Sequence, residues 1–482
     1  MSSPIVWIIF PGMVSVILLI LQRSKMAVYI SGTLVAVLLG GLAWLLPIGE
    51  SISIVSISIP FGDTLVVLGR RFVLDANDRS MLLLIYMGLA FWLAGSWAAQ
   101  AGRLFVPLGI AIAGLLTAAL TVEPFLYAAL ILQVVVLVSI PLINPPGSHP
   151  GGGVLRYLTY QTLGFPFILF TGWLISGVDS TIPNVDQALL AYVMMGIGFW
   201  LLLGIIPFHT WIPLFAEQSH PYAAAFLFYE LPLAIMLFGL GFLDSYPWLQ
   251  DAAGLYTILE IAGAMMILIA GLFAAFQTHL GRMFGYAVLV EIGVSLIAVR
   301  LGLQSGGMEN LLGLFFAILL PRALSYGVWA LALVALIRYA SIDQINFSAN
   351  STELTFRNIR GYARRIPVAA FSLLLAHFSL AGLPLLVGFP VRLQIWRGTA
   401  QISVLLAGIV LAGYSGLVVG GIRSMAAMIA GSADNPWEIN ETRIEIILLV
   451  LGSFVLLLMG LLPQLFTPAL AQMADFFLQN SP

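Results

Sequence analysis

Residues 196–221 read GIGFWLLLGIIPFHTWIPLFAEQSHP, an apolar helical run that is broken by Pro207 before the next hydrophobic run begins. A proline inside a helix removes a backbone donor and clashes with the preceding turn. Backbone groups that are freed inside hydrocarbon persist only where protein buries them or where they line a wet cavity. A break followed by His209, Glu217 and His220 therefore predicts a polar path inside a bundle of membrane helices. An ordinary helix end with a loop at the membrane surface is the alternative interpretation.

The composition of the whole chain indicates a membrane protein. Of its 482 residues, 61% are hydrophobic and only 8% are charged. A soluble domain of this length needs more charge on its surface, so we expect a polytopic protein of the lipid bilayer. The absence of cysteine excludes disulfides and thiolate metal sites, and a net charge of −2 without a basic run gives no support for nucleic acid. No phosphate-binding glycine loop, dinucleotide fingerprint or HExxH motif occurs, so no cofactor or metal is predicted.

Apolar runs of about 20 residues, the length that crosses a bilayer, recur roughly fourteen times. They cover approximately residues 4–21, 27–47, 80–99, 104–122, 124–143, 154–177, 188–206, 221–243, 254–276, 283–300, 309–338, 367–390, 401–422 and 443–465. One side of these runs carries Lys25, the only lysine, and most of the arginines, including the four at 357–365. The positive-inside rule places that side in the cytoplasm and both termini outside.

Three features interrupt the pattern of apolar runs. Residues 50–75 alternate polar and apolar side chains around a Pro-Phe-Gly-Asp turn and predict an extramembrane β-hairpin. Residues 339–366 are polar and predict a helix that lies on the membrane surface. Pro321 falls in the middle of the run 309–338 and predicts a second broken helix. Corresponding broken helices in two halves of a chain point to inverted repeats.

Ionisable side chains at membrane depth are costly and usually functional. Arg322 stands inside AILLPRALSYGVWAL and needs a carboxylate, carbonyls or water nearby, because arginine stays charged in nearly any environment. Histidines such as His209 and His377 are suited to relay protons at neutral pH. Snorkelling arginines and neutral, hydrogen-bonded glutamic acids are the alternatives. The predicted proton path consists of Glu230, Glu291, Arg322, His377 and Arg392.

Three segments together resemble the antiporter-like membrane subunits of respiratory complex I, a family shared with Mrp-type sodium/proton antiporters and membrane-bound hydrogenases. They are GIIPFHTWIP at 204–213, GLFAAFQTHLGRMFGY at 271–286 and SLAGLPLLVGFPVR at 379–392. The resemblance implies an all-α membrane fold of about fourteen helices with two inverted five-helix repeats. The implied division is 1–100 for the N-terminal helices and hairpin, 101–243 and 254–422 for the two repeats, and 443–482 for the C-terminal helix and tail.

The family moves ions along a central axis of a glutamate and lysines in each half, and the chain departs from that pattern. By the resemblance, the first-half glutamate falls on Gln133 and a lysine falls on Leu202. In the second half, two lysines fall on Arg322 and Arg392, and a histidine falls on Glu291. Buried lysine can give up a proton whereas arginine cannot, so proton passage by lysine deprotonation is not expected here.

Three functions are compatible with these residues. The first is an ion-translocating subunit of a redox-driven NADH/quinone oxidoreductase-type complex, which works with other membrane subunits on protons or sodium and has no active site of its own. The second is a structural, non-conducting module, which Gln133 and Leu202 favour. The third is a transporter outside such a complex, or an Mrp-type cation/proton antiporter subunit. The resemblance implies an energy-transducing membrane, bacterial cytoplasmic or thylakoid-type, with any electron chemistry in partner subunits.

Overall fold

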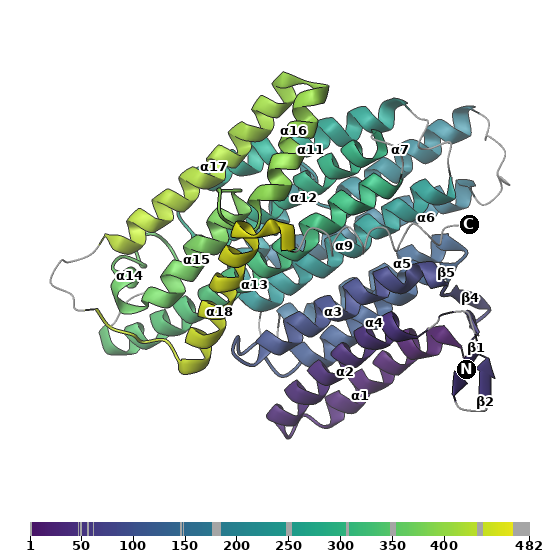
Figure 1. Ribbon diagram of the computed structural model, residues 1–482, viewed down its shortest axis with the longest axis horizontal. Helices are drawn as coiled ribbons and strands as arrows, with labels where there is room; N and C mark the ends of the chain where they lie inside the picture. The colour runs from purple at the N-terminus through teal and green to yellow at the C-terminus, as the bar shows by residue number, and fades with distance from the viewer. Residues whose placement is uncertain are drawn as a thin grey trace.

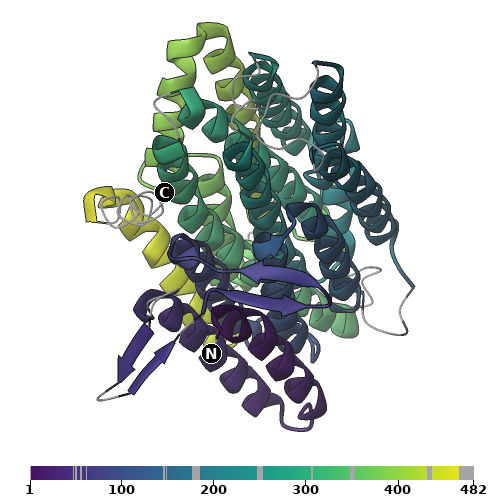
Figure 2. The same cartoon turned by 90° about the vertical axis from the view of Figure 1, so that its right-hand side faces the viewer.

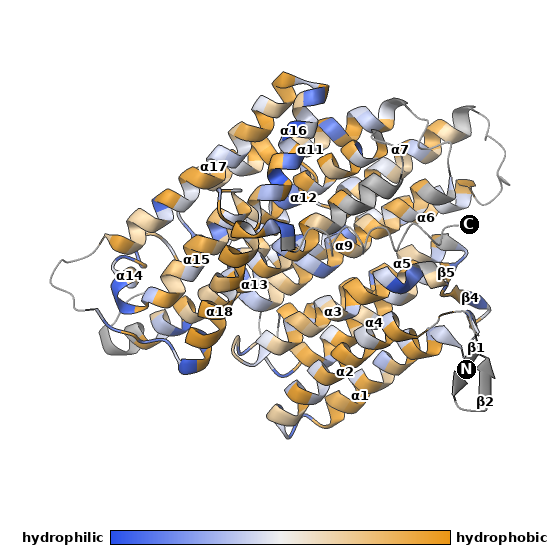
Figure 3. Ribbon diagram, in the orientation of Figure 1, coloured by the Kyte–Doolittle hydropathy of each residue, from blue (hydrophilic) through white to orange (hydrophobic). Residues whose placement is uncertain are grey.

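The computed structural model describes residues 2–46, 48, 51–54, 57–60, 62–144, 147, 149–175, 185–246, 253–304, 308–347, 353–430 and 437–465. These residues form a bundle of long helices that run side by side, with short strands near the N-terminus at one end of it (Figure 1, Figure 2). Hydrophobic residues dominate the helices, and hydrophilic residues gather around the short helix α14 at the opposite end (Figure 3).

Most of the chain is helical. The helices are α1 (Phe10–Ile20, preceded by a π-helical turn Ile5–Ile9), α2 (Lys25–Leu45), α3 (Arg79–Ser96), α4 (Phe105–Thr121), α5 (Ala128–Ile143), α6 (Gly152–Ile175), α7 (Val185–Leu202), α8 (Trp211–Gln218), α9 (Pro221–Ser245), α11 (Ala253–Phe276), α12 (Leu280–Gln304), α13 (Met308–Phe347), α14 (Tyr362–Arg365), α15 (Pro367–Leu380), α16 (Phe389–Ile402), α17 (Val404–Ile429) and α18 (Arg443–Leu461). A helix satisfies its backbone groups internally, which is why it suits a chain this apolar.

The helices correspond to the runs that hydropathy predicts. Within the described residues, nine helices are long and apolar enough to cross a membrane, and five shorter apolar helices accompany them. Each of them overlaps one predicted run, from Ile5–Ile20 at the N-terminal end to Arg443–Leu461 at the other. The predicted all-α membrane fold is therefore confirmed, and the number of complete membrane crossings stays a prediction.

Three helices occupy the centre of the bundle. In the most apolar windows of α9, α12 and α13, 83%, 94% and 78% of the residues are buried, compared with 33% for α2 and 28% for α18. The outer helices thus present apolar side chains to lipid, whereas polar groups on α9, α12 and α13 are surrounded by protein. Ionisable residues in the buried parts of these helices are shielded from the bilayer by protein.

Helices α11 and α17 approach so closely that their contact needs glycine. A Cβ built on Gly271 would lie 2.1 Å from the carbonyl oxygen of Gly413, and one built on Gly416 would lie 2.3 Å from the carbonyl oxygen of Gly271. Small residues at such contacts let membrane helices pack backbone against backbone.

The stretch 50–75 forms two antiparallel hairpins rather than the single one predicted. Strand β1 (Ser51–Ile54) pairs with β2 (Ile57–Pro60), and β3 (Thr64–Val67) pairs with β4 (Arg70–Val73), to which β5 (Val122–Glu123) is added. The turn of the second hairpin is Leu68-Gly69, with positive φ angles of 51° and 73°. Such two-residue turns match the twist of the paired strands. The turn predicted at Pro-Phe-Gly-Asp is wrong where the chain is described, because Pro60 ends β2 and Gly62 and Asp63 precede β3; Phe61 lies outside the described residues.

The predicted break at Pro207 is confirmed. Helices α7 and α8 are separated by an irregular segment around this proline. The carbonyl oxygen of Leu202 accepts a hydrogen bond from Gln161 Nε2, and that of Ile206 accepts one from Trp200 Nε1, both at 2.8 Å. Protein groups thus satisfy carbonyls that the broken helix leaves free, as burial in an apolar medium requires.

The predicted break at Pro321 is wrong. Helix α13 continues from Met308 to Phe347 with this proline in its interior. The second irregular segment lies instead at residues 381–388, between α15 and α16, so the run predicted at 367–390 is not one helix. Both irregular segments contain a glycine with positive φ, Gly204 at 63° and Gly382 at 76°, a conformation that glycine adopts without steric cost.

The surface helix predicted for residues 339–366 is also wrong where the chain is described. Helix α13 extends to Phe347, and between 353 and 366 the only helix is the four-residue α14. This segment instead pairs with the connection between α11 and α12. Leu280 N donates to the Leu354 carbonyl at 3.0 Å, and Phe356 N donates to the Thr278 carbonyl at 2.7 Å. Backbone pairing, rather than a new helix, satisfies these polar groups.

Candidate functional site

A buried carboxylate on α12 lies between two arginines from other helices. Arg322 Nε on α13 is 3.0 Å from Glu291 Oε2. Arg392 Nη2 on α16 donates to Glu291 Oε1. The three residues are 2 to 7% exposed. We call Glu291, Arg322 and Arg392 the charge cluster. Two cations and one anion leave it with a formal charge of +1 at the centre of the bundle.

Each arginine of the charge cluster is held by further contacts. Arg322 Nη2 donates to the backbone carbonyl of Glu291 and to Ser295 Oγ, both at 2.7 Å. Arg392 Nη1 donates to the Gly388 carbonyl at 3.3 Å, and its guanidinium lies 5.8 Å from the centre of the Tyr414 ring. Buried charges persist only when they are paired and hydrogen-bonded. Arg322 meets that condition, whereas Arg392 Nε has no hydrogen-bond partner among the described residues.

The irregular segment between α15 and α16 leaves space for the Arg392 side chain. A Cβ on Gly382 would lie 2.5 Å from Arg392 Cδ, and one on Gly388 would lie 2.4 Å from Arg392 Nη1. Glycines therefore shape the space around the guanidinium. Pro321 immediately precedes Arg322 in α13, and it sits in an unbroken helix rather than in a break.

Glu230 on α9 differs from Glu291 because no partner neutralises it. The residue is 1% exposed, and neither carboxyl oxygen has a hydrogen-bond partner within the described residues. Its Oε1 lies 3.0 Å from the position of a Cβ on Gly88, so the carboxyl group packs against the backbone of α3. Helix α9 packs against α13, which carries Arg322. Glu230 is thus a buried acid without a described partner on a helix next to one that holds part of the charge cluster.

His377 on α15 is buried but lies apart from the charge cluster. Its Nε2 is 2.7 Å from the Leu417 carbonyl oxygen, and its ring centre is 4.7 Å from that of Trp329. The Phe284 ring meets Tyr326 edge to face and lies tilted against Trp329. In the described part of the chain, no hydrogen bond links His377 or Glu230 to Glu291. The structure brings together three of the five predicted path residues and surrounds the other two with aromatic and backbone groups.

In the first half of the chain, Gln133 and Leu202 occupy the positions at which the family resemblance implies a glutamate and a lysine. Gln133 on α5 donates through Nε2 to Thr162 Oγ1 at 3.1 Å, near the surface. Leu202 is buried in the core, and its backbone carbonyl accepts a hydrogen bond from Gln161. His209 lies half-buried in the irregular segment between α7 and α8. The sequence reasoning missed Gln161 and Ser295, although Gln161 is a polar residue in the apolar run 154–177.

A second ionic cluster lies at the end of the bundle that carries α14. Arg282 Nε donates to Glu217 Oε2 at 2.7 Å, and His279 Nε2 is 4.0 Å from Glu217 Oε1. His279 Nδ1 accepts from the Gly281 N–H at 3.1 Å, which leaves Nε2 as the protonated nitrogen of the neutral ring. Burial lowers the pKa of His279, and nearby Glu217 acts in the opposite direction. This cluster joins α8 to the start of α12.

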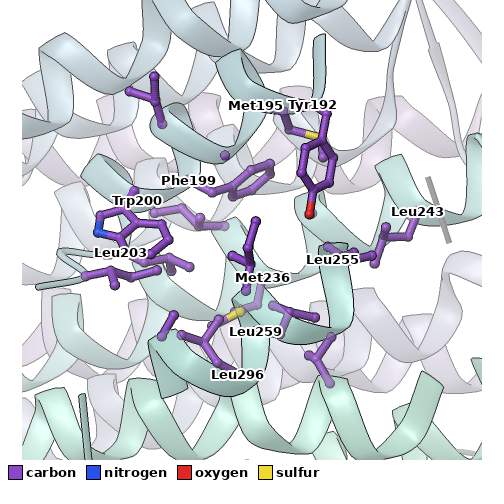
Figure 4. A pocket seen from close by; sticks show the side chains of 18 of the residues that line it. Tyr192, Met195, Phe199, Trp200, Leu203, Met236, Leu243, Leu255, Leu259 and Leu296 are labelled. Atoms are coloured by element: carbon purple, nitrogen blue, oxygen red, sulfur yellow. The ribbon is translucent and has the colours of Figure 1, made fainter. Parts of the chain in front are cut away.

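A cavity beside the broken helix is apolar. A cavity of about 310 Å³ lies between α7, α9, α11 and α12, and its lining is almost wholly hydrocarbon (Figure 4). Tyr192 contributes a hydroxyl group to it, whereas none of the ionisable residues named above lines it. This cavity is therefore not part of the charged site.

The fold and the charge cluster define a class of protein: a polytopic helical membrane protein that holds ionisable side chains on central helices beside two irregular segments. Residues 155–418 match the family described as NADH:quinone oxidoreductase/Mrp antiporter, TM. The matched stretch is more than half of the chain, and the chain belongs to this antiporter-like membrane family. The resemblance stated from the sequence is confirmed.

Individual relatives are distant in sequence. The NADH-quinone oxidoreductase subunit N of Methylovorus glucosotrophus is 24% identical over 68% of this chain and 67% of its own length. The subunit N of Francisella tularensis is 26% identical over 60% of this chain, and the match spans only 57% of that relative. A chain of the Mrp complex from Dietzia has a TM-score of 0.78 at 15% identity, with 99% of this chain and 98% of that chain covered. A chain of respiratory complex I from Thermus thermophilus has a TM-score of 0.73 at 18% identity, with 98% and 99% covered.

Proposed function

We propose that the chain is an ion-translocating subunit of a redox-driven, NADH/quinone oxidoreductase-type membrane complex and contributes a proton path. The observation that carries the proposal is that the core contains both a buried charge cluster and, on another central helix, Glu230, which has no partner among the described residues. Family membership and the names of the relatives support the same type of complex. The count of about fourteen spans in two inverted repeats belongs to this proposal.

The two kinds of buried acid have different roles in this mechanism. Glu291 stays ionised, because guanidinium groups on both sides stabilise its charge and do not release protons. Glu230 takes up and releases the proton, because burying an unpaired carboxylate costs far more free energy than burying the neutral acid. A change in the position of Arg322 alters the field at Glu230 and so shifts its protonation equilibrium. Movements in partner subunits would drive that change.

His377, Pro207 and His209 have supporting roles in this proposal. His377 bonds to a backbone carbonyl and stands against Trp329, so it serves as a relay only if the aromatic ring moves. The irregular segments at Pro207 and Gly382 supply the backbone groups that line a path.

A structural, non-conducting module is the second candidate. Three observations favour it: Leu202 is a core residue, Gln133 lies near the surface, and both arginines of the charge cluster are fixed by several hydrogen bonds. Under this alternative the charge cluster only locks α12, α13 and α16 together. An Mrp-type cation/proton antiporter subunit is a further alternative that the shared fold supports.

Driven proton uptake separates these candidates. The native complex would be reconstituted into sealed vesicles, and proton uptake would be compared between wild type, Glu230→Gln and Glu291→Gln. Glu260→Gln on α11 is the matched control, because Glu260 is paired with Arg300 and its own side chain is 25% exposed. We expect Glu230→Gln to assemble normally and to lose most of the flux assigned to this subunit, while the control keeps it. Full flux in an assembled Glu230→Gln complex would establish the structural module.

A further inference from the structure

An open apolar groove runs along the outer face of α2 and α3. It has a volume of about 570 Å³ and is lined by α2 residues from Met26 to Val37 and by α3 residues from Leu93 to Trp97. At 1.5 Å of rise per residue, the α2 portion is about 16 Å long. That length is about half of a bilayer's ~30 Å hydrocarbon core. The length of the groove therefore matches the thickness of the hydrocarbon layer of one lipid leaflet.

A cationic pocket adjoins the end of the groove that lies at the start of α2. It is lined by Gln22, Lys25 and Arg103, and it shares Tyr29 with the groove. Lys25 is the only lysine of the chain, and no acidic residue occurs among residues 1–49 or 79–122. Lys25 and Arg103 are exposed, and neither forms an ion pair with any residue that the structure describes. The positive charge here is unbalanced by the protein itself.

Two helix starts add to the positive character of this pocket. Helix α2 begins at Lys25, and α4 begins at Phe105, two residues after Arg103. Ser24, at the N-cap of α2, provides no side-chain cap, so backbone N–H groups there remain available. Helix N-termini favour anions through these N–H groups and through the helix dipole.

An aromatic pair marks the boundary between the pocket and the groove. The rings of Tyr29 and Trp97 meet edge to face with centres 5.4 Å apart, and the Trp97 side chain is 40% exposed. Tyrosine and tryptophan concentrate where the hydrocarbon core meets the headgroups. The pair thus places the cations at headgroup level and the groove at acyl-chain level.

We propose that this site binds one anionic phospholipid, with its phosphodiester at Lys25 and Arg103 and one acyl chain in the groove between α2 and α3. The match of groove length to a leaflet, the unbalanced cations and the aromatic boundary all fit that occupant. Clusters of Lys and Arg at the cytoplasmic side of membrane helices attract anionic headgroups, and Lys25 lies on the arginine-rich side. A free anion would leave the groove unfilled, and an apolar helix would leave both cations unpaired.

The single lysine makes the test specific. The full chain would be reconstituted in nanodiscs of phosphatidylcholine alone or with phosphatidylglycerol, and the rate of amine acylation at Lys25 would be read by peptide mass spectrometry. We expect phosphatidylglycerol to slow acylation several-fold relative to phosphatidylcholine. Equal rates in the two membranes would overturn the proposal. Equal protection by millimolar inorganic phosphate in phosphatidylcholine would overturn it too, since the site would then select an anion only.

Two variants separate the headgroup contacts from the groove. Arg103→Gln should abolish the protection of Lys25 and leave the groove intact. Thr33→Trp fills the groove without changing charge and should reduce both the protection and the phosphatidylglycerol retained through purification. Val450→Trp on the lipid-facing side of α18 is the matched control and should change neither. Full protection in Thr33→Trp would show that no acyl chain occupies the groove. If Thr33→Trp does not fold, the Arg103→Gln variant decides the question by itself: protection of Lys25 that survives in Arg103→Gln would overturn the proposal.

Discussion

The Arg322 guanidinium contacts both the side chain and the backbone carbonyl of Glu291. The Nε atom lies 3.0 Å from the Glu291 carboxylate, and Nη2 donates to the carbonyl oxygen of the same residue at 2.7 Å. These two donors point in directions fixed by the planar guanidinium, so one residue of α13 binds α12 at two places. The contact explains why an arginine occupies a position at which the family resemblance implies lysine.

Arg322→Lys should therefore destabilise the protein even though it keeps the charge. A lysine ammonium cannot reach the carboxylate, the carbonyl and Ser295 with the same geometry, so at least one charged hydrogen bond is lost. We expect a loss of about 1–3 kcal/mol in the free energy of unfolding. Reversible unfolding in mixed micelles measures it. Arg397→Lys, at an exposed arginine of α16, is the control and should change little; equal effects of the two variants would contradict the argument.

Removing the carboxylate should cost more than removing one arginine. Glu291→Gln raises the formal charge of the charge cluster from +1 to +2 and leaves two buried guanidiniums without an anion. Arg392→Gln lowers the charge to zero and leaves Glu291 paired with Arg322. We expect Glu291→Gln to cost on the order of 3–5 kcal/mol and Arg392→Gln to cost clearly less. The double variant completes the cycle. The reverse order of the two single variants would show that Glu291 is not the anchor.

The sequence predicts the helices well because hydropathy alone places them. Pro207 was also readable, since a proline in an apolar run with a polar turn behind it signals a break. Pro321 also lies in an apolar run, but its helix is continuous. A single proline in an apolar run therefore does not by itself predict a broken helix. The segment around Gly382 was hidden, because SLAGLPLLVG is apolar throughout and hydropathy continues across it. Its glycine and proline were the available turn signal.

The charge cluster was predictable in its members and not in its geometry. Arg322 and Glu291 are 31 residues apart, and Arg392 and Glu291 are 101 apart. Intramembrane position singled out each residue separately. The rotation and packing of the helices determine which carboxylate faces which arginine. Side-chain contacts along whole helices set that rotation and packing, so the sequence pattern alone does not give them. The same limit applies to Glu230, whose lack of a partner is a property of its neighbours on α3.

Stability should depend on pH through Asp78, just before α3. The side chain is half-buried, and removal of water by the surrounding protein raises its pKa from 3.8 to about 7. Its hydrogen bond from the Asp75 N–H acts to lower the pKa, and the charge of Asp75 raises it further. Between pH 4 and 7 the folded protein keeps a proton that the unfolded chain releases, so stability should fall as pH rises through this range. The melting temperature of Asp78→Asn should fall less over the same interval. Parallel curves for the two proteins would exclude Asp78 as the source.

Asn is the informative substitution at this position because it separates charge from capping. Asp78 Oδ2 accepts the Asp75 N–H at 2.8 Å, and an amide oxygen can accept the same bond. A variant that lost the capping contact would be destabilised equally at every pH. The difference between melting temperatures at pH 5 and pH 8 is therefore the quantity to compare, rather than either temperature alone.

The contact between α11 and α17 gives a prediction with an internal control on one helix. A Cβ on Gly416 would overlap the Gly271 backbone, whereas nothing lies within 4 Å of a Cβ on Gly408. Gly416→Ala should force the helices apart and cost about 1–3 kcal/mol, the usual range for overpacking. Gly408→Ala should be neutral or stabilise by about 0.5–1 kcal/mol, because alanine favours a helix interior. Thermal unfolding of both variants in detergent measures the difference. If Gly416→Ala unfolded at the temperature of Gly408→Ala, the backbone-to-backbone packing of these helices would be disproved.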